Sequence, residues 1–287
     1  MRKDIILPAV AAGAGALGFG LRRWQLSSGF EPDTGLAIPG APAAAALVAC
    51  SAALAALLLI LAWGHKERMG WERAFRGARN CSVYMTAMVL AAFLLLGSAG
   101  IEVLAYPGSL QTAQAAESWG VRTAATVLPP LRILLCLGGC PCVLLWSRNL
   151  YRGGEGGKES LPLLELCFLF CVWLVSNYQS CAADPVVMNY IWEVLAICFS
   201  LLGLYYVASY SFLKEAHPRR TVLACLMAVF FSLTAMGGGL QISELLRCGF
   251  SALFLGGHAA LILQEHPAEE TAEESISAEQ KETEDNA

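Results

Sequence analysis

The sequence predicts an all-α protein, a polytopic transmembrane bundle of about eight helices. Three observations lead to this prediction: 56% of the 287 residues are hydrophobic, only 15% are charged, and the charges are bunched between long uncharged runs. A soluble domain of this size would distribute its charges over its surface. The apolar runs approach the roughly 20 residues that cross a bilayer, and they lack the polar alternation of a barrel strand.

The apolar runs define eight expected spans, each bounded by charged or turn-forming residues. The first run is rich in glycine and alanine and follows a charged start, a pattern that a cleaved signal peptide also has. No clean small-x-small cleavage motif precedes Leu21, so we interpret this run as a retained helix. The expected spans are 5–21, 43–63, 83–105, 127–146, 161–178, 185–213, 221–236 and 240–263.

The basic residues predict the orientation, because lysine and arginine are retained on the cytoplasmic side of a membrane. Only Arg22, Arg23 and Arg122 fall on the opposite side. Both termini are therefore expected in the cytoplasm, which requires an even number of spans. The expected cytoplasmic segments hold Arg2, Lys3, Lys66, Arg68, Arg73, Arg76, Arg79, Arg148, Arg152, Lys158, Lys214, Arg219 and Arg220.

The end of the chain has a different composition from the rest. Residues 264–287 contain nine acidic residues, one lysine and no aromatic residue. Such a segment cannot bury enough apolar surface to fold alone. We predict a transmembrane domain over residues 1–263 and a disordered acidic cytoplasmic tail over residues 264–287.

Two polar loops are expected to face opposite sides of the membrane. The outer loop after the first span carries Arg22, Arg23, Glu31 and Asp33, and turn chemistry around Pro32 favours an ordered cap in which the arginines pair with the acids. The inner loop 64–82 is basic with interleaved aromatics, as in segments that lie on an anionic leaflet. Docking of a membrane or cytoplasmic protein through this loop and the acidic tail is the alternative. Lipids are the expected partners, and no nucleic acid is expected.

The sixth span carries a carboxylate, Glu193, whose depth decides its role. Asp184 is a plausible N-cap and Pro185 a favoured first helical residue, but Tyr190 and Trp192 mark the hydrocarbon edge beside Glu193. The carboxylate is therefore expected at the outer boundary. Four other charges share this level, and together they predict a polar vestibule for a small solute or protons, with interfacial snorkelling as the alternative. The candidate residues are Glu102, Arg132, Glu193, Glu244 and Arg247, the last two at a spacing that allows pairing on one helix face.

Eleven cysteines lie almost entirely in or beside the spans, so free thiols are expected rather than a disulfide framework. One group has the composition of a soft-metal thiolate site, although no metal or other cofactor is predicted. Cys-Pro-Cys in a membrane helix resembles the metal-transporting P-type ATPases, whose phosphorylation motif and catalytic domain are missing here. The group comprises Cys136, Cys140, Cys142, Cys167 and Cys171.

No enzyme is predicted. Ser98 and His258 would serve an intramembrane serine protease, but they are expected near opposite ends of their spans and cannot share a proton. The sequence also has no phosphate-binding Gly-Lys loop and no His-Glu-x-x-His motif.

The stretches RRWQLSSGFEPDTGLAIPGAP and SCAADPVVMNYIWEVLA resemble those of small uncharacterised multi-pass membrane proteins of anaerobic Gram-positive bacteria. This resemblance implies a bacterial plasma membrane and supplies no function. Two function classes remain: a non-enzymatic accessory or sensor-type membrane protein, and a small-solute or ion transporter that uses the outer charged cluster.

Overall fold

The computed structural model describes residues 3–31, 34, 36–61, 69–115, 119–154, 161–181, 186–213 and 216–264. Over these residues the chain is all-α with no strand, as predicted. It forms nine α-helices, and eight of them are long and apolar enough to cross a membrane. The helices are α1 (Lys3–Ser28), α2 (Pro42–Leu61), α3 (Trp71–Phe75), α4 (Ser82–Ala115), α5 (Trp119–Arg152), α6 (Leu161–Cys181), α7 (Ile191–Phe212), α8 (Pro218–Met236) and α9 (Ile242–Leu263), with 3₁₀ turns η2 (Arg76–Ala78) and η4 (Val187–Asn189).

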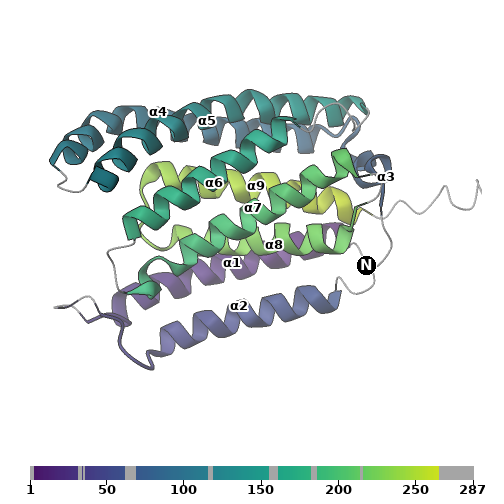
Figure 1. Ribbon diagram of the computed structural model, residues 1–287. Coiled ribbons are helices and arrows are strands. Elements are labelled where there is room, and N and C mark those ends of the chain that lie inside the picture. The colour runs from purple at the N-terminus through teal and green to yellow at the C-terminus, as the bar shows by residue number, and fades with distance from the viewer. Residues whose placement is uncertain are drawn as a thin grey trace, which may run out of the picture.

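The eight long helices run side by side, with successive helices antiparallel (Figure 1). We call the end that holds α3 and the start of α1 the proximal end, and the opposite end, where α1 turns toward α2, the distal end. The even number of long helices brings the start of α1 and the end of α9 to the same, proximal end. The acidic tail, residues 265–287, lies outside the described residues.

The centre of the bundle is formed by α8 and α9. Buried residues make up 72% and 56% of their spanning windows, against 17% to 44% in the other six long helices. Helices α1 and α7 pack on α8, α4 packs on α9, and α2 lies at the edge against α1 (Figure 1). Lipid tails are as apolar as the side chains, so membrane helices associate through close packing rather than through the hydrophobic effect. Gly18 of α1 illustrates this, because a Cβ atom there would overlap the hydroxyl of Thr234 on α8.

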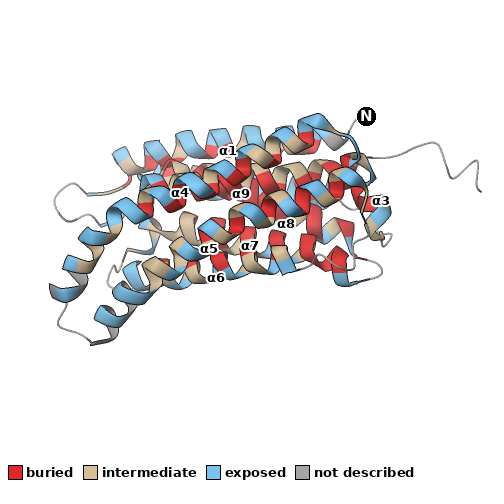
Figure 2. Ribbon diagram, turned by 90° about the horizontal axis from the view of Figure 1, so that it is seen from above, coloured by how far each residue is buried: buried red, intermediate tan, exposed pale blue. Residues whose placement is uncertain are grey.

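Helices α4 and α5 are longer than predicted. The sequence predicted that the third span would end near residue 105 and the fourth begin near 127, but helix continues to Ala115 and resumes at Trp119. Their ends therefore project as a paired arm beyond the other helices at the distal end (Figure 1), and Figure 2 shows the arm as mostly exposed or half-buried. Pro107, which lies beyond the predicted end of the third span, is accommodated inside α4, and Pro129 and Pro130 lie inside α5 as the predicted fourth span requires.

Two further boundaries differ from prediction. Helix α1 runs to Ser28 rather than to residue 21, so Arg22 and Arg23 belong to a helix and not to the outer loop. Helix α7 begins at Ile191 after the turn η4, rather than at Pro185, so the predicted cap by Asp184 is wrong for this helix. Asp184 and Pro185 themselves lie outside the described residues.

The proximal segment before α4 does not present its aromatic residues outward. Phe75 of α3 is buried, Trp71 is half-buried, and both pack edge-on against Trp146 of α5. The indole nitrogen of Trp71 donates to the Gly154 carbonyl at 3.1 Å. These two aromatic residues therefore attach α3 to the bundle, and the exposed face carries Glu72 and Arg73 instead.

Candidate functional site

Three of the five predicted vestibule residues meet at the distal end. Glu102 of α4 forms an ion pair with Arg132 of α5, whose Nε lies 2.8 Å from one carboxylate oxygen, and a second pair with Nη1 of Arg247 on α9. The side chain of Glu102 is 6% exposed, that of Arg132 15% and that of Arg247 0%. We call these three residues the ion triad; it joins α4, α5 and α9 through one carboxylate.

The surroundings of the ion triad hold the two arginines in place. Arg132 also donates to the hydroxyl of Ser176 on α6 at 2.7 Å. The guanidinium of Arg247 lies over the Trp173 ring, 4.6 Å from its centroid, and donates to Ser98 at 3.3 Å. A cation over an aromatic face gains electrostatic stabilisation that grows when the pair is removed from water. Each arginine is therefore held by α6 as well as by its ion pair with Glu102 on α4.

The ion triad is not fully paired. Its single carboxylate faces two guanidinium groups, which leaves one positive charge, and Nε and Nη2 of Arg247 are buried without a hydrogen-bond partner. The indole nitrogen of Trp173 is also buried, beside the carboxylate of Glu193. Buried polar atoms without partners are uncommon in native proteins, and in a membrane they are associated with functional sites.

The other two vestibule residues do not join the triad directly. Glu193 lies in the first turn of α7, in electrostatic range of Arg247 and Glu244, and its Oε1 atom is buried without a hydrogen-bond partner. Glu244 accepts a hydrogen bond from the backbone N–H of Gln241 at 2.9 Å and completes a capping box at the start of α9. The predicted Glu244–Arg247 pairing is therefore wrong, because each side chain is committed elsewhere.

The residues of the predicted outer cap are divided between two environments. Arg22 is 2% exposed, and it donates to the carbonyl oxygens of Met188 and Asn189 at 3.0 and 2.6 Å and to Gln25 at 2.8 Å. The guanidinium of Arg23 lies over the Phe19 ring. Glu31 accepts from Thr34 at 2.7 Å, and Asp33 lies outside the described residues. Arg22 therefore ties α1 to η4 and does not pair with Glu31 as predicted.

A layer of hydroxyl groups lies next to the ion triad, at the middle of α7 and α9 and in the distal half of α8. Ser200 and Ser251 are 2.5 Å apart, and Ser232 donates to Ser251 at 3.3 Å. All three residues are buried. Four buried polar residues recur along α9 at spacings of four, four and seven residues, which place them on one face of the helix. They form a buried polar stripe: Ser243, Arg247, Ser251 and His258.

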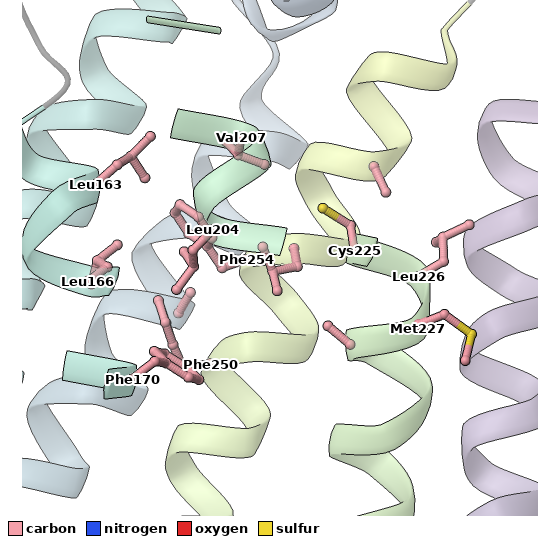
Figure 3. Packing of buried hydrophobic residues seen from close by; sticks show 14 of the residues in the cluster. Leu163, Leu166, Phe170, Leu204, Val207, Cys225, Leu226, Met227, Phe250 and Phe254 are labelled. Atoms are coloured by element: carbon pink, nitrogen blue, oxygen red, sulfur yellow. The ribbon is translucent and has the colours of Figure 1, made fainter. Parts of the chain in front are cut away.

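An apolar layer interrupts this stripe. Phe250 and Phe254 of α9 pack with Leu204 of α7 and Phe170 of α6, and Cys225 of α8 lies beside them (Figure 3). Each of these side chains is at most 1% exposed. The layer therefore separates the hydroxyl layer from the polar residues at the proximal end.

A compact aromatic cluster surrounds His258 at the proximal end. The imidazole Nε2 accepts from the indole of Trp146 at 2.9 Å and lies 3.3 Å from the Tyr84 hydroxyl, while Nδ1 lies 2.7 Å from the Phe254 carbonyl oxygen. Indole nitrogen can only donate, so Nε2 is the acceptor and Nδ1 carries the proton. Every polar atom of the neutral ring is thereby satisfied, and we call this group the histidine cluster.

The cysteines are free thiols among the described residues, and no group of three or more His, Cys, Asp or Glu side chains there could hold a metal ion. The close thiol contact in the predicted cluster is to a carboxylate, since Cys142 lies 2.6 Å from Glu165. Nothing in the described part of the bundle therefore supports the thiolate site built from Cys136, Cys140, Cys142, Cys167 and Cys171.

A scan against protein-family models matched no family, and searches of curated proteins and of solved structures gave no match. The site is therefore interpreted from its own geometry. Sequence reasoning missed the contact of Ser98 with Arg247, the role of Trp173, and the roles of Ser251 and of His258 as an acceptor. The signal that could have revealed the last two was the recurrence of polar residues on one face of the last span.

Proposed function

We propose that this integral membrane protein is a non-enzymatic sensor or accessory protein and that the ion triad is its switchable element. The supporting observation is that one carboxylate, Glu102, holds arginines from two other helices. A buried ion pair is a contact that is either made or broken, so it suits a two-state element. An anionic group that bound the arginines better in the separated state would shift the population toward that state.

The separation of polar groups supports a role without catalysis. Ser98 donates to the Ser243 carbonyl, whereas His258 pairs with Tyr84, which lies fourteen residues before Ser98 on α4. That spacing corresponds to about 21 Å along the helix axis. A serine nucleophile and a histidine base must lie within hydrogen-bond reach of each other, so these two residues cannot cooperate.

The orientation and location that we propose follow from charge and resemblance. Lysine and arginine gather in segments at the proximal end, which on the basis of the positive-inside rule faces the cytoplasm. The distal end then faces outward, and the resemblance to bacterial proteins favours a plasma membrane. A protein partner would meet the basic loop 64–82 and the acidic tail on the cytoplasmic side.

A second candidate, transport of a small solute or of protons, is favoured by the unpartnered atoms near the triad. Arg247 Nε and Nη2 offer donors and Glu193 Oε1 offers an acceptor, all buried within one cluster. The polar stripe of α9 continues from there to the hydroxyl layer. The apolar layer around Phe254 closes this route, so transport would require the layer to open.

Flux measurements in vesicles separate the two candidates. Purified protein would be reconstituted with a trapped pH-sensitive dye, and proton flux and uptake of radiolabelled amino acids and acetate would be measured after imposing a gradient. The sensor or accessory function predicts no flux above that of empty vesicles, for the wild type and for Glu193→Gln alike. Flux in the wild type that Glu193→Gln abolishes would replace the proposed function with transport.

A further inference from the structure

A groove of about 550 Å³ runs along α2 at the distal end, away from the ion triad. Its walls are the end of α1, the connecting residues 37–41, one face of α2 from Ala44 to Ala52, and Met188. This volume falls in the range of roughly 300–1,000 Å³ that is typical of small-molecule sites. We call it the α1–α2 groove.

The distal wall of the groove is held by backbone hydrogen bonds. Ile38 donates to the Gly29 carbonyl at 2.9 Å and Glu31 donates to the Leu36 carbonyl at 2.9 Å, so the connection folds back on the end of α1. An isolated bridge pairs Phe30 with Ala37. The connection therefore forms a wall before any ligand is present, which reduces the entropy lost on binding.

The floor of the groove consists of small apolar side chains. Ala45, Ala49 and Ala52 recur on one exposed face of α2, and only 22% of the spanning window of this helix is buried. The floor extends over about 12 Å from residue 44 to residue 52. In a bilayer this face lies directly against acyl chains, and alanines leave a depression that one chain can fill without displacing protein atoms.

One residue with a polar side chain, Gln25, borders the groove at its distal end. Gln25 is 1% exposed and lines the groove, and its carbonyl oxygen accepts a hydrogen bond from Arg22. Arginine can only donate, so this contact fixes the amide orientation and directs the NH₂ group away from Arg22. That NH₂ group makes no hydrogen bond to any residue that the structure describes.

We infer that the α1–α2 groove binds one acyl chain of a membrane phospholipid, with an ester carbonyl of the same lipid accepting a hydrogen bond from the Gln25 amide. The chain lies on the alanine face of α2, and the ester region lies at the level where α1 ends and α2 begins. Trp24, which is 45% exposed beside Gln25, occupies this interfacial level, where tryptophans concentrate. The site is independent of the function proposed for the ion triad.

Lipid retention in native mass spectrometry tests this inference. Full-length protein would be reconstituted in vesicles of phosphatidylethanolamine and phosphatidylglycerol, extracted in mild detergent, and analysed for bound phospholipid. We expect one retained phospholipid per wild-type chain. Ala49→Phe fills the groove and is expected to abolish retention, whereas Ala56→Phe is its matched control, because Ala56 is exposed on α2 outside the groove.

Gln25→Glu tests the polar contact separately. This substitution keeps an acceptor for Arg22 but removes the amide donor, so the fold is preserved while retention falls about tenfold, the effect of one lost hydrogen bond. The inference is wrong if the wild type retains no phospholipid, or if Ala49→Phe and Ala56→Phe retain equal amounts. It is also wrong if Ala49→Phe dissociates a dimer, since a second copy would then occupy the groove.

Discussion

The ion triad and the histidine cluster are buried polar groups at opposite ends of one bundle, and they differ in how completely they are satisfied. At the distal end, Glu102 serves two arginines, and Nε and Nη2 of Arg247 are left without partners. At the proximal end, both ring nitrogens of neutral His258 are hydrogen-bonded. The first arrangement is charged and incomplete, and the second is neutral and complete.

This difference indicates which end of the bundle can change state. A neutral cluster with every atom paired has one favourable arrangement and serves as a fixed anchor for α3, α5 and α9. A charged cluster with a surplus donor edge gains hydrogen bonds if another acceptor arrives, so it can exchange partners. We therefore assign switching to the distal end and structural fixation to the proximal end.

The largest expected effect is at the shared carboxylate. Glu102→Leu leaves Arg247 fully buried without its ion-pair partner, and removing one partner of a buried ion pair costs about 3–5 kcal/mol. Arg132 is 15% exposed and can redirect its head group toward the interface, so most of the loss comes from Arg247. Denaturant titration in mixed micelles measures this free energy of unfolding.

The double variant Glu102→Leu/Arg247→Leu controls for the lost charge. It removes both members of the buried pair, and apolar replacement of a whole pair is often neutral. We expect the double variant to be more stable than Glu102→Leu alone. If the double variant were as stable as Glu102→Leu or less stable, the unpaired charge of Arg247 would not be the cause of the loss.

The histidine cluster is expected to respond less strongly. His258→Leu removes the acceptor of the buried Trp146 indole, and one unsatisfied buried donor costs about 1–3 kcal/mol. Tyr84→Phe, which loses only a 3.3 Å contact, is the matched control and should change stability by less than about 1 kcal/mol. A larger loss of unfolding free energy from Tyr84→Phe than from His258→Leu would contradict the hydrogen-bond roles assigned to Trp146 and Tyr84.

Removing Arg132, the more exposed arginine of the ion triad, tests how the two arginines differ in their contribution to stability. Arg132→Met leaves Glu102 paired with Arg247 and retains the length of the side chain, so we expect a loss of about 1 kcal/mol. The same titration measures it. A loss as large as that of Glu102→Leu would show that the two arginines contribute equally, contrary to their difference in burial.

The smallest effect is expected in the hydroxyl layer. Ser251→Ala removes one interhelical hydrogen-bonding group, and such groups in membrane bundles contribute on average about 0.6 kcal/mol. Ser232→Ala, which loses a longer 3.3 Å bond, should have a still smaller effect. Losses above about 2 kcal/mol would indicate that this layer, rather than the ion triad, fixes the packing of α7, α8 and α9.

Much of the fold could be predicted from the sequence, because lipid requires continuous apolar runs and the chain has eight of them. The helix ends could not be predicted as well. Pro107 favours a loop in water, yet α4 packs on α5 and continues through it. Arg22 likewise favoured a loop, and only the carbonyl oxygens of η4 allow it to be buried in a helix.

The candidate site was predicted as a set of residues at one depth but not as a set of contacts. Glu102, Arg132 and Arg247 lie far apart in the sequence, and the depth argument could not show which of the five charges touch. The role of Glu244 required the backbone of Gln241, and the position of Arg247 required the Trp173 ring. These are tertiary contacts between helices whose packing order cannot be derived from hydropathy.

The most direct test of the switch is a distance across the ion triad. Spin labels would be introduced as unnatural amino acids, because the chain has eleven cysteines, at the exposed positions Val127 of α5 and Ile242 of α9. Pulsed electron spin resonance in nanodiscs would then compare the wild type with Glu102→Gln. We predict one narrow distance distribution for the wild type and a second, longer population for the variant; identical narrow distributions would contradict the claim that Glu102 holds α5 and α9 together.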